Sequence, residues 1–429
     1  MSSSGLFDRT ANLPASRAIF RALAAGLAGM IFAGLGFAAP TPALAKPEDA
    51  GLSTPRVQRL SAWVERLQAE GKLSGAVSVV YRRGKLVRFE AQGYADLESR
   101  RAMRPDDLFA IASMTKPIAT VGVLMLLEEQ RLLLSDPVEK YLPEFAQPKV
   151  AVAKADAPAG YVLVPAERSI TIHDLLTHRS GLPTPAGPAA AVLAKVSDAL
   201  TGDADLATRT KALATVPLNF QPGAAWQYGS STDVLGRVIE VITGQTLDVY
   251  LRERIFAPLG MVDTGFVVPP EKRGRIATLY TAPLTGGLEK MEPRPTDSRN
   301  FSAGGGLFST APDYLRFCQM LLNGGELDGH RLLSRKSIEL MTARHSDPIP
   351  LPFLRGQYFG LGVAVQKNDG ESGLLSSPGT YGWSGAYNTY FRIDPKEQLI
   401  LLLMVQRAPG NILEIQYGFQ NTVMQAIVE

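Results

Sequence analysis

Residues 108–127 read LFAIASMTKPIATVGVLMLL. The run from Pro117 to Leu127 is almost wholly apolar, which predicts a helix buried in the protein core. Ser113 and Lys116 stand three residues apart at its start, so on a helix their side chains share one face. Desolvation disfavours the charged form of a buried lysine, so such a lysine can accept the proton of a neighbouring serine. The stretch therefore predicts a serine nucleophile with a lysine base. A capping serine with a solvated lysine is the plainer interpretation, but a solvated lysine fits poorly before an apolar run.

Sequence typical of strands flanks this stretch on both sides. A helix is predicted from Thr54 to Gly71, and a closing helix over 411–428. Strands are predicted over residues 75–82, 85–94, 359–366, 386–394 and 398–406. The pattern predicts an α+β fold in which one antiparallel sheet, built from both ends of the chain, is flanked by helices and carries a mostly helical inserted lobe.

The predicted boundaries follow from this pattern. The α/β lobe takes in residues of about 46–112 together with 300–429, and the helical lobe takes in about 113–299. Within the helical lobe, 146–160 and 183–190 contain few large apolar residues and are predicted to be surface loops. The junction of the two lobes is the expected place for a ligand.

Composition excludes several classes of function. The chain has 429 residues, of which 45% are hydrophobic and 20% charged, and its formal net charge is only +3. That balance, without a basic run, argues against a nucleic-acid partner. The single cysteine, Cys318, excludes a disulfide within the chain and a cysteine-built zinc site. Four histidines leave little room for a histidine metal centre, so we expect no metal ligands.

The first 45 residues have the layout of a secretory signal peptide. Three arginines precede residues 22–39, which are apolar and rich in Ala and Gly, and Ala43-Leu44-Ala45 follows two prolines. This layout predicts cleavage after Ala45, export to the periplasm or medium of a bacterium, and no stable membrane span afterwards. An uncleaved anchor is the alternative, but the apolar run is short and weakly hydrophobic for a span.

Two further motifs could contribute to a catalytic site. Tyr228 stands between a Gln-Pro-Gly turn and a helical run, where its phenol could reach into a cleft as a proton shuttle, with Ser230 beside it. The stretch Trp383-Ser384-Gly385-Ala386 has small residues that let a strand edge approach a ligand, and its backbone N–H could bind an oxyanion. Taken alone, a packing tyrosine and a glycine-permitted bend explain these motifs equally well.

Other patterns support no separate chemistry. His173 and His178 are five residues apart and lack the intervening glutamate of a zinc helix, so structural histidines are the better interpretation. No G-x-S-x-G motif is present, which leaves an α/β-hydrolase triad unsupported. The glycines at 304–306 lack the lysine of a phosphate-binding loop and are predicted to form a tight bend near the cleft.

Taken together, the motifs resemble the serine β-lactamase and penicillin-binding-protein superfamily. That family carries S-x-x-K, then a Tyr-based motif, then a K-T-G-type strand, and Ser113, Tyr228 and Trp383 follow the same order. The phrases LSDPV, LLTHRSGL and FSAGGGL, at 134–138, 175–182 and 301–307, are similar to those of class C-like members. Two positions depart from the family: Ser230 replaces an asparagine, and Trp383 replaces the K-T-G lysine.

The resemblance implies roles for individual residues. Ser113 would attack a carbonyl carbon, Lys116 and Tyr228 would act as a coupled base and acid, and the N–H groups of Ser113 and Ala386 would form the oxyanion hole. Trp383, Ser384, Gly385 and Ser230 would line the substrate pocket, and no metal or organic cofactor would be needed. An indole lacks the positive charge that recognises an anionic substrate, so the Trp-x-Gly form, similar to that of family VIII carboxylesterases, favours neutral esters.

The expected function is a serine carboxylesterase that cleaves small esters through an acyl-enzyme, with acyl transfer to alcohols as a possible second reaction. The main alternative is a β-lactamase or a D-alanyl-D-alanine-type peptidase, for which neighbouring arginines would have to supply the missing cation. The third alternative is a non-catalytic penicillin-recognising protein. The natural ester, the acyl chain length and the oligomeric state do not follow from the sequence.

Overall fold

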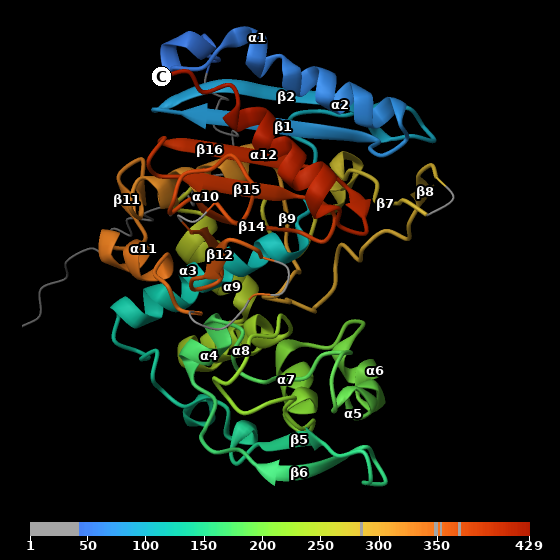
Figure 1. The fold of residues 1–429 in the computed structure, drawn as a ribbon, viewed down its shortest axis with the longest axis vertical. Coiled ribbons are helices and arrows are strands. Elements are labelled where there is room, and N and C mark those ends of the chain that lie inside the picture. Colours follow the sequence, from blue (N-terminus) through green and yellow to red (C-terminus); the bar gives the residue numbers. More distant parts are fainter. Residues whose placement is uncertain (1–42, 284–285, 347–350, 352–353, 368–369) are drawn as a thin grey trace, which may run out of the picture. The chain divides into compact units, whose positions relative to one another are not determined.

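The computed structural model describes residues 43–283, 286–346, 351, 354–367 and 370–429. The predicted signal peptide therefore lies, apart from Ala43 to Ala45, outside the described residues. Within the described residues, an eight-stranded antiparallel sheet is the centre of the α/β lobe (Figure 1). Its strands, in order across the sheet, are β12 (Gln357–Phe359), β13 (Ala364–Gln366), β14 (Tyr381–Ser384), β15 (Tyr390–Asp394), β16 (Leu399–Met404), β1 (Gly75–Arg82), β2 (Lys85–Asp96) and β3 (Arg101–Ala102).

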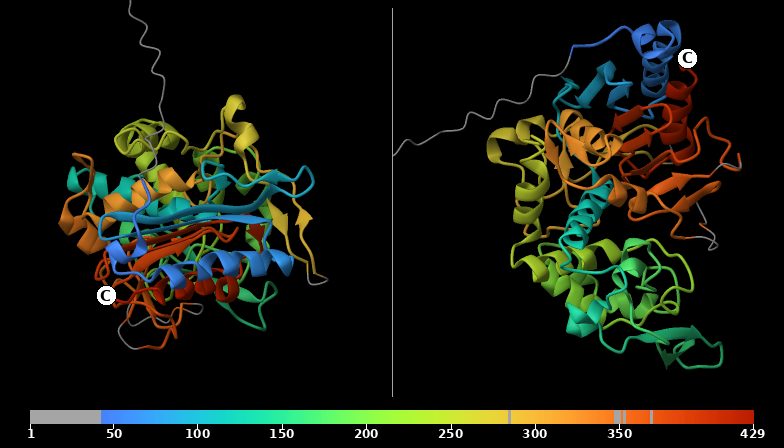
Figure 2. Two further views of the ribbon diagram at one scale, coloured as in Figure 1. Left: turned by 90° about the horizontal axis from the view of Figure 1, so that it is seen from above. Right: turned by 90° about the vertical axis from the view of Figure 1, so that its left-hand side faces the viewer.

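Both faces of the sheet are covered, as the continuous apolar sequence of β16 requires. Successive side chains of a strand point to opposite faces. Leu399, Leu401 and Leu403 accordingly join one hydrophobic cluster, and the alternate residues join the other. On the first face lie α1 (Thr54–Val57), α2 (Arg59–Ala69) and α12 (Gly418–Met424), with α2 and α12 side by side (Figure 2).

The second face packs against helices from the middle of the chain. α10 (Ala311–Leu322) contacts β16 and β1, and α3 (Thr115–Glu128) lies between this lobe and the helical lobe. α3 is buried over nearly all of its length, which explains its apolar sequence. Beside α10 are α11 (Arg335–Met341) and a small hairpin of β10 (Glu326–Leu327) and β11 (His330–Arg331).

The helical lobe is built around α8 (Ser231–Thr243), which contacts α3, α4 and α7. The remaining helices are α4 (Ile172–Leu176), α5 (Ala190–Lys195), α6 (Ser197–Leu200), α7 (Leu206–Ala214) and α9 (Leu247–Leu251), and α9 continues as a π-helical turn, Arg252–Phe256. A hairpin of β5 (Lys149–Ala153) and β6 (Tyr161–Pro165) lies at the far end of this lobe (Figure 1).

Short ladders join the segments that surround the site. β4 (Phe109–Ala110) pairs with β9 (Phe308–Ser309), which places the chain just before Ser113 beside the loop that precedes α10. β7 (Tyr280–Thr281) pairs with β8 (Glu289–Lys290) and with β17 (Arg407–Ala408). Tyr280 and Thr281, expected in the helical lobe, therefore pair with the C-terminal part of the chain.

The α+β class with an antiparallel sheet and flanking helices is confirmed, and so are most of its predicted elements. Three local predictions are wrong. Within 146–160, predicted to be a loop, residues 149–153 form strand β5 with Val150 and Ala151 buried, and only the residues that follow form the turn to β6. Residues 359–366 are two strands around a turn at Gly362, whose φ is +69°. The strand predicted over 386–394 begins at Tyr390, after a turn.

The closing helix also differs from its prediction. Residues 411–428 were expected to form one helix, but they contain a π-helical turn, Ile412–Tyr417, followed by α12. The turn is compatible with the burial of Ile415 and Phe419 against the same face of the sheet.

Candidate active site

The Ser113 hydroxyl and the Lys116 amine are in contact at the start of α3. Ser113 belongs to a 3₁₀ turn, Ala112–Met114, that leads into the helix, and its Oγ lies 3.1 Å from Lys116 Nζ. Lys116 is buried, and its Nζ also lies 2.6 Å from the Gly304 carbonyl oxygen. An amine held in this way is placed to donate to the Gly304 carbonyl and to exchange a proton with the Ser113 hydroxyl. The predicted contact is therefore present.

The backbone in front of Ser113 is held in an unusual conformation. Ala112 has a φ of +43°, in the left-handed region that costs a residue other than glycine about 1 kcal/mol. Hydrogen bonds fix the chain on both sides, because Ile111 N–H donates to Leu307 and Met114 N–H donates to Ile111, both at 3.0 Å. Such a conformation persists where the surroundings over-determine it, so the half-buried Ser113 sits at a rigid, sharp turn.

Tyr228 completes a chain of contacts that leads to Trp383. The indole Nε1 of Trp383 donates to the Tyr228 phenol Oη at 3.1 Å. Lys116 Nζ lies 4.6 Å from the centre of the Tyr228 ring. Tyr228 precedes α8 and Trp383 lies in β14, so the two side chains come from opposite lobes. We call Ser113, Lys116 and Tyr228 the predicted catalytic group, because the structure gathers all three.

His178 lies directly behind this group. It is fully buried, and its ring centre lies 4.7 Å from that of Tyr228 and 5.5 Å from that of Phe359. Burial lowers the pKa of His178 to about 3, and the charge of Lys116 adds to this shift. The imidazole is therefore neutral at working pH and packs against Tyr228 as an aromatic ring. A structural role for His178 matches the interpretation made from the sequence. No pattern in the sequence indicated that His178 would lie beside Tyr228.

The end of β14 approaches the backbone in front of Ser113. Gly385 N–H donates to the Thr389 carbonyl at 2.7 Å, and the Thr389 hydroxyl donates to the Ile111 carbonyl at 3.2 Å. A Cβ on Gly385 would lie 2.5 Å from that same carbonyl oxygen, so only glycine allows this approach. Ala386 follows in an exposed turn, and its role in an oxyanion hole remains a prediction.

The remaining predicted pocket residues lie at the rim of this arrangement. Ser384, half-buried at the end of β14, lines a small cavity together with Trp383. Ser230 stands at the N-terminus of α8 and makes no side-chain capping bond. In the described residues no hydrogen bond joins Ser230 to the predicted catalytic group, and its place in a substrate pocket remains a prediction.

Sequence reasoning missed the residue that positions the Gly304 carbonyl. Asp233, in the first turn of α8, accepts from the Ser302 hydroxyl at 2.7 Å and from Gly304 N–H at 2.9 Å. Its carboxylate also lies 3.5 Å from Arg209. The bend at 304–306, predicted to lie near the cleft, contacts Lys116 through the Gly304 carbonyl. The hydrogen bond from Gly304 to Asp233 joins residues 71 positions apart, so no local pattern in the sequence indicates it.

Comparison with known proteins shows the family of this chain. The family model described as Beta-lactamase matches residues 60–415. This chain belongs to that family. Among its curated relatives, esterase EstB of Burkholderia gladioli is 34% identical over 82% of this chain and 90% of its own length. A putative D-alanyl-D-alanine carboxypeptidase of Escherichia coli is 27% identical over 86% of each chain.

A solved structure shows the same fold. EstCE1, described as a hydrolase with promiscuous acyltransferase activity, superposes with a TM-score of 0.72 at 24% identity, covering 87% of this chain and 98% of its own. The family membership and the relatives together make this chain a hydrolase of the serine β-lactamase family, with esterases among its relatives.

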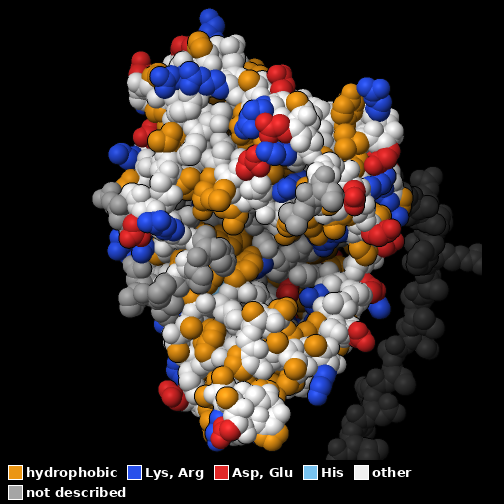
Figure 3. Space-filling view, turned by 45° about the vertical axis from the view of Figure 1, so that its right-hand side comes forward, with side chains coloured by type: hydrophobic (Ala, Val, Ile, Leu, Met, Phe, Trp, Pro, Cys, Tyr) orange, Lys and Arg blue, Asp and Glu red, His pale blue; other side chains and the backbone are white. Residues whose placement is uncertain are grey.

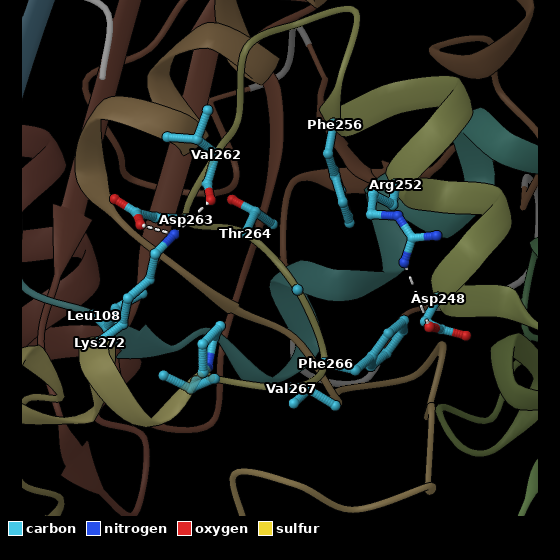
Figure 4. A pocket seen from close by; sticks show the side chains of 13 residues that line it. Leu108, Asp248, Arg252, Phe256, Val262, Asp263, Thr264, Phe266, Val267 and Lys272 are labelled. Carbon is cyan, nitrogen blue, oxygen red and sulfur yellow. Dashed lines mark hydrogen bonds and ion pairs between the residues drawn. The ribbon is translucent and has the colours of Figure 1, made fainter. Parts of the chain in front are cut away.

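The surface of this β-lactamase family member is hollowed across its middle in Figure 3, with hydrophobic side chains along the hollow. A cavity of about 270 Å³ lies elsewhere, beside α9 and residues 262–269. Figure 4 shows that each cation of this cavity faces an acid: Lys272 lies 2.7 Å from Asp263, and Arg252 lies 3.9 Å from Asp248. The cations that line this cavity are thus paired with acids that also line it, and no residue of the predicted catalytic group is among the lining residues.

Among the described residues, no group of three or more His, Cys, Asp or Glu side chains is arranged to hold a metal ion. No helix in the described part of the chain combines the length and the apolar character that crossing a membrane requires.

Proposed function

We propose that this chain is a serine carboxylesterase, similar to the family VIII esterases, that cleaves small carboxylic esters through an acyl-enzyme on Ser113. The observation that carries the proposal is the hydrogen bond from Trp383 Nε1 to Tyr228 Oη. A neutral indole N–H stands where the K-T-G pattern has a lysine ammonium. The indole N–H can orient the Tyr228 phenol by donating a hydrogen bond to it, but it offers no positive charge to a substrate carboxylate. Neutral esters are therefore the favoured substrates.

The reaction uses groups that are already in contact. Ser113 Oγ attacks the ester carbonyl carbon while its proton passes to the coupled pair of Lys116 and Tyr228. The N–H groups of Ser113 and Ala386, at the positive end of α3, stabilise the oxyanion. The C–O bond to the alcohol breaks, and the alcohol leaves with the proton. Water then attacks the acyl-enzyme, gives its proton to the same pair, and releases the acid and free Ser113. An alcohol in place of water would give a new ester.

Initial rates on p-nitrophenyl butyrate and on nitrocefin test this proposal. Residues 46–429 are compared with the Ser113→Ala protein, which should be inactive on both substrates. We expect fast ester turnover with weak or no nitrocefin turnover. Faster turnover of nitrocefin than of p-nitrophenyl butyrate would favour the β-lactamase function over the esterase function. A fluorophosphonate probe that leaves Ser113 unlabelled would support a non-catalytic penicillin-recognising protein instead.

A β-lactamase or D-alanyl-D-alanine-type peptidase is the second candidate, and one observation favours it. Arg392 is buried and lines the small cavity shared by Trp383 and Ser384. Its guanidinium donates to neutral acceptors, the Tyr390 hydroxyl, the Ala364 carbonyl and the Gln357 side chain. Among the described residues, no ion pair involves this guanidinium. Release of D-alanine from a D-alanyl-D-alanine peptide, lost in Arg392→Gln, would support this candidate.

We also propose that residues 1–45 direct export and are removed after Ala45. The three-part layout of this segment supports the proposal. N-terminal sequencing of the protein from a periplasmic fraction tests it. A mature chain that begins at Lys46 is the expected result, and an intact N-terminus in a membrane fraction would contradict it.

A further inference from the structure

A cavity of about 300 Å³ lies beside the ladder of β4 and β9, outside the predicted catalytic group. Ala110 of β4 and Phe308 of β9 form one wall. The rest of the lining is Arg273, residues 276–279, Lys290, Met291, Pro293, Arg294, Thr296 and Gln406. Most of the lining is apolar, so the cavity suits a hydrocarbon chain.

Three cations, Arg273, Lys290 and Arg294, also line the cavity, whereas no carboxylate does. Two of them are matched by acids nearby. Lys290 Nζ lies 3.3 Å from Asp96 and 3.4 Å from Glu98. Arg273 lies 3.3 Å from Asp297.

Arg294 is different, because no carboxylate of the described residues forms an ion pair with it. Its side chain is held in place by a hydrogen bond from Nη1 to the Gly305 carbonyl at 2.8 Å and by the Phe308 ring, 5.5 Å from Cζ. Burial lowers the pKa of the Arg294 guanidinium from its usual value. A guanidinium that is fixed, desolvated and unmatched is a site for an anion.

The cavity lies next to the loop that contacts Lys116. Arg294 donates to the Gly305 carbonyl, and the carbonyl before it, that of Gly304, accepts from Lys116. Ala110 in the cavity wall stands three residues before Ser113. A carboxylate bound by Arg294 would therefore lie on the outer side of the loop that holds the catalytic lysine.

We propose that this cavity binds a carboxylate with an apolar tail, with Arg294 as the carboxylate-binding residue and the apolar wall around Phe308 as the tail-binding surface. The ligand is either a free medium-chain acid or the far carboxylate of a substrate's acyl chain. The second source rests on the proposed esterase function, whereas the first does not.

Binding to the full-length Ser113→Ala protein tests the proposal without any turnover. Calorimetry would compare octanoate with octanamide, which has the same tail and no charge. We expect octanoate to bind about tenfold more tightly, as a partly buried charge-assisted hydrogen bond implies. Arg294→Gln should abolish this preference, and Arg294→Lys should retain part of it. Arg273→Gln is the matched control, because Asp297 already neutralises that cation, and it should keep the preference.

A kinetic comparison separates the two sources of the carboxylate. The active full-length protein is assayed on p-nitrophenyl octanoate and on the mono-p-nitrophenyl ester of suberic acid. If Arg294→Gln lowers kcat/KM about tenfold for the suberate ester alone, the substrate supplies the carboxylate. If Arg294→Gln changes kcat/KM equally for both esters, and octanoate binding still depends on Arg294, the ligand is the free acid.

Equal affinities for octanoate and octanamide in the parent protein would overturn the proposal. This comparison uses the parent protein alone, so it does not depend on whether an Arg294 variant folds. An undiminished preference in Arg294→Gln would overturn it as well. An inactive protein on p-nitrophenyl butyrate would instead count against the esterase function, so the two failures are distinguishable.

Discussion

The Trp383 indole donates a hydrogen bond to the Tyr228 phenol across 3.1 Å, from a strand of one lobe to the start of a helix in the other. The bond links the position that departs most from the family pattern to a predicted catalytic residue. Because the donor is neutral, it can orient Tyr228 and still leave the pocket without an added charge there. The loss of the lysine thus removes a charge but keeps a donor.

Removing this donor should slow the reaction. Trp383→Phe keeps an aromatic ring and loses the N–H, so kcat on p-nitrophenyl butyrate should fall about tenfold, which corresponds to one hydrogen bond of about 1.4 kcal/mol. Trp63→Phe, on α2 at the opposite face of the sheet, controls for loss of a buried indole and should leave kcat unchanged. Equal rates for Trp383→Phe and the parent would show that the bond has no catalytic role.

A charge placed at the same position should change the substrate preference. Trp383→Lys restores a donor toward Tyr228 and adds a cation beside Ser384. We expect the ratio of nitrocefin to p-nitrophenyl butyrate turnover to rise at least about tenfold, since the ammonium can pair with the β-lactam carboxylate. Trp383→Gln offers a donor without a charge and serves as its control. The same ratio in both variants would mean that charge does not determine preference here.

The predicted catalytic group should behave as one unit. Ser113→Ala, Lys116→Ala and Tyr228→Phe should each lower kcat by about a thousandfold or more, because one proton pathway connects them. The double variant of Lys116 and Tyr228 should be little worse than either single one. Full activity of Lys116→Ala on p-nitrophenyl butyrate would rule out the mechanism, and multiplied losses in the double variant would show that the two residues act independently.

His178 should make stability depend on pH. Burial lowers its pKa to about 3 in the folded protein, so below pH 6.5 the unfolded chain binds a proton that the folded chain does not. Stability is therefore lost as pH falls from 6.5 toward 3. Against His178→Asn, which tolerates the positive φ of +56° and does not titrate, the parent should lose up to about 3 kcal/mol between pH 6.5 and 4.

Urea unfolding of both proteins at several pH values measures this difference. The comparison is needed because other groups titrate in the same window. Burial raises the pKa of Asp313 to about 6, which favours the folded state at low pH and partly hides the effect of His178 in the parent alone. His173 and His345 have lowered pKa values through burial and act in the same direction as His178. Parallel curves for parent and variant would contradict the prediction.

Local pattern was enough to predict the α+β class, most of the strands, and the contact between Ser113 and Lys116. Helical periodicity brings residues three apart onto one face wherever the helix forms, and an apolar run must be buried wherever it lies. The resemblance to the β-lactamase family added Tyr228 and Trp383 through the order of their motifs. One error fell on a short apolar segment, 359–366, where a glycine turn divides one apparent strand into two.

The sequence by itself thus determined most of the elements and predicted which of their residues would carry the chemistry. Only the tertiary structure decided which neutral donor reaches Tyr228, which carboxylate holds the Gly304 loop, and which arginine is left without an acid. The physical reason is distance along the chain. Trp383 and Tyr228 are 155 residues apart, and Asp233 and Gly304 are 71 apart, so their contacts follow from how sheet and helices pack and not from any local pattern. The pairing of the cavity's cations also depends on packing: Asp297, only three residues from Arg294, pairs with Arg273, and Lys290 pairs with the distant Asp96.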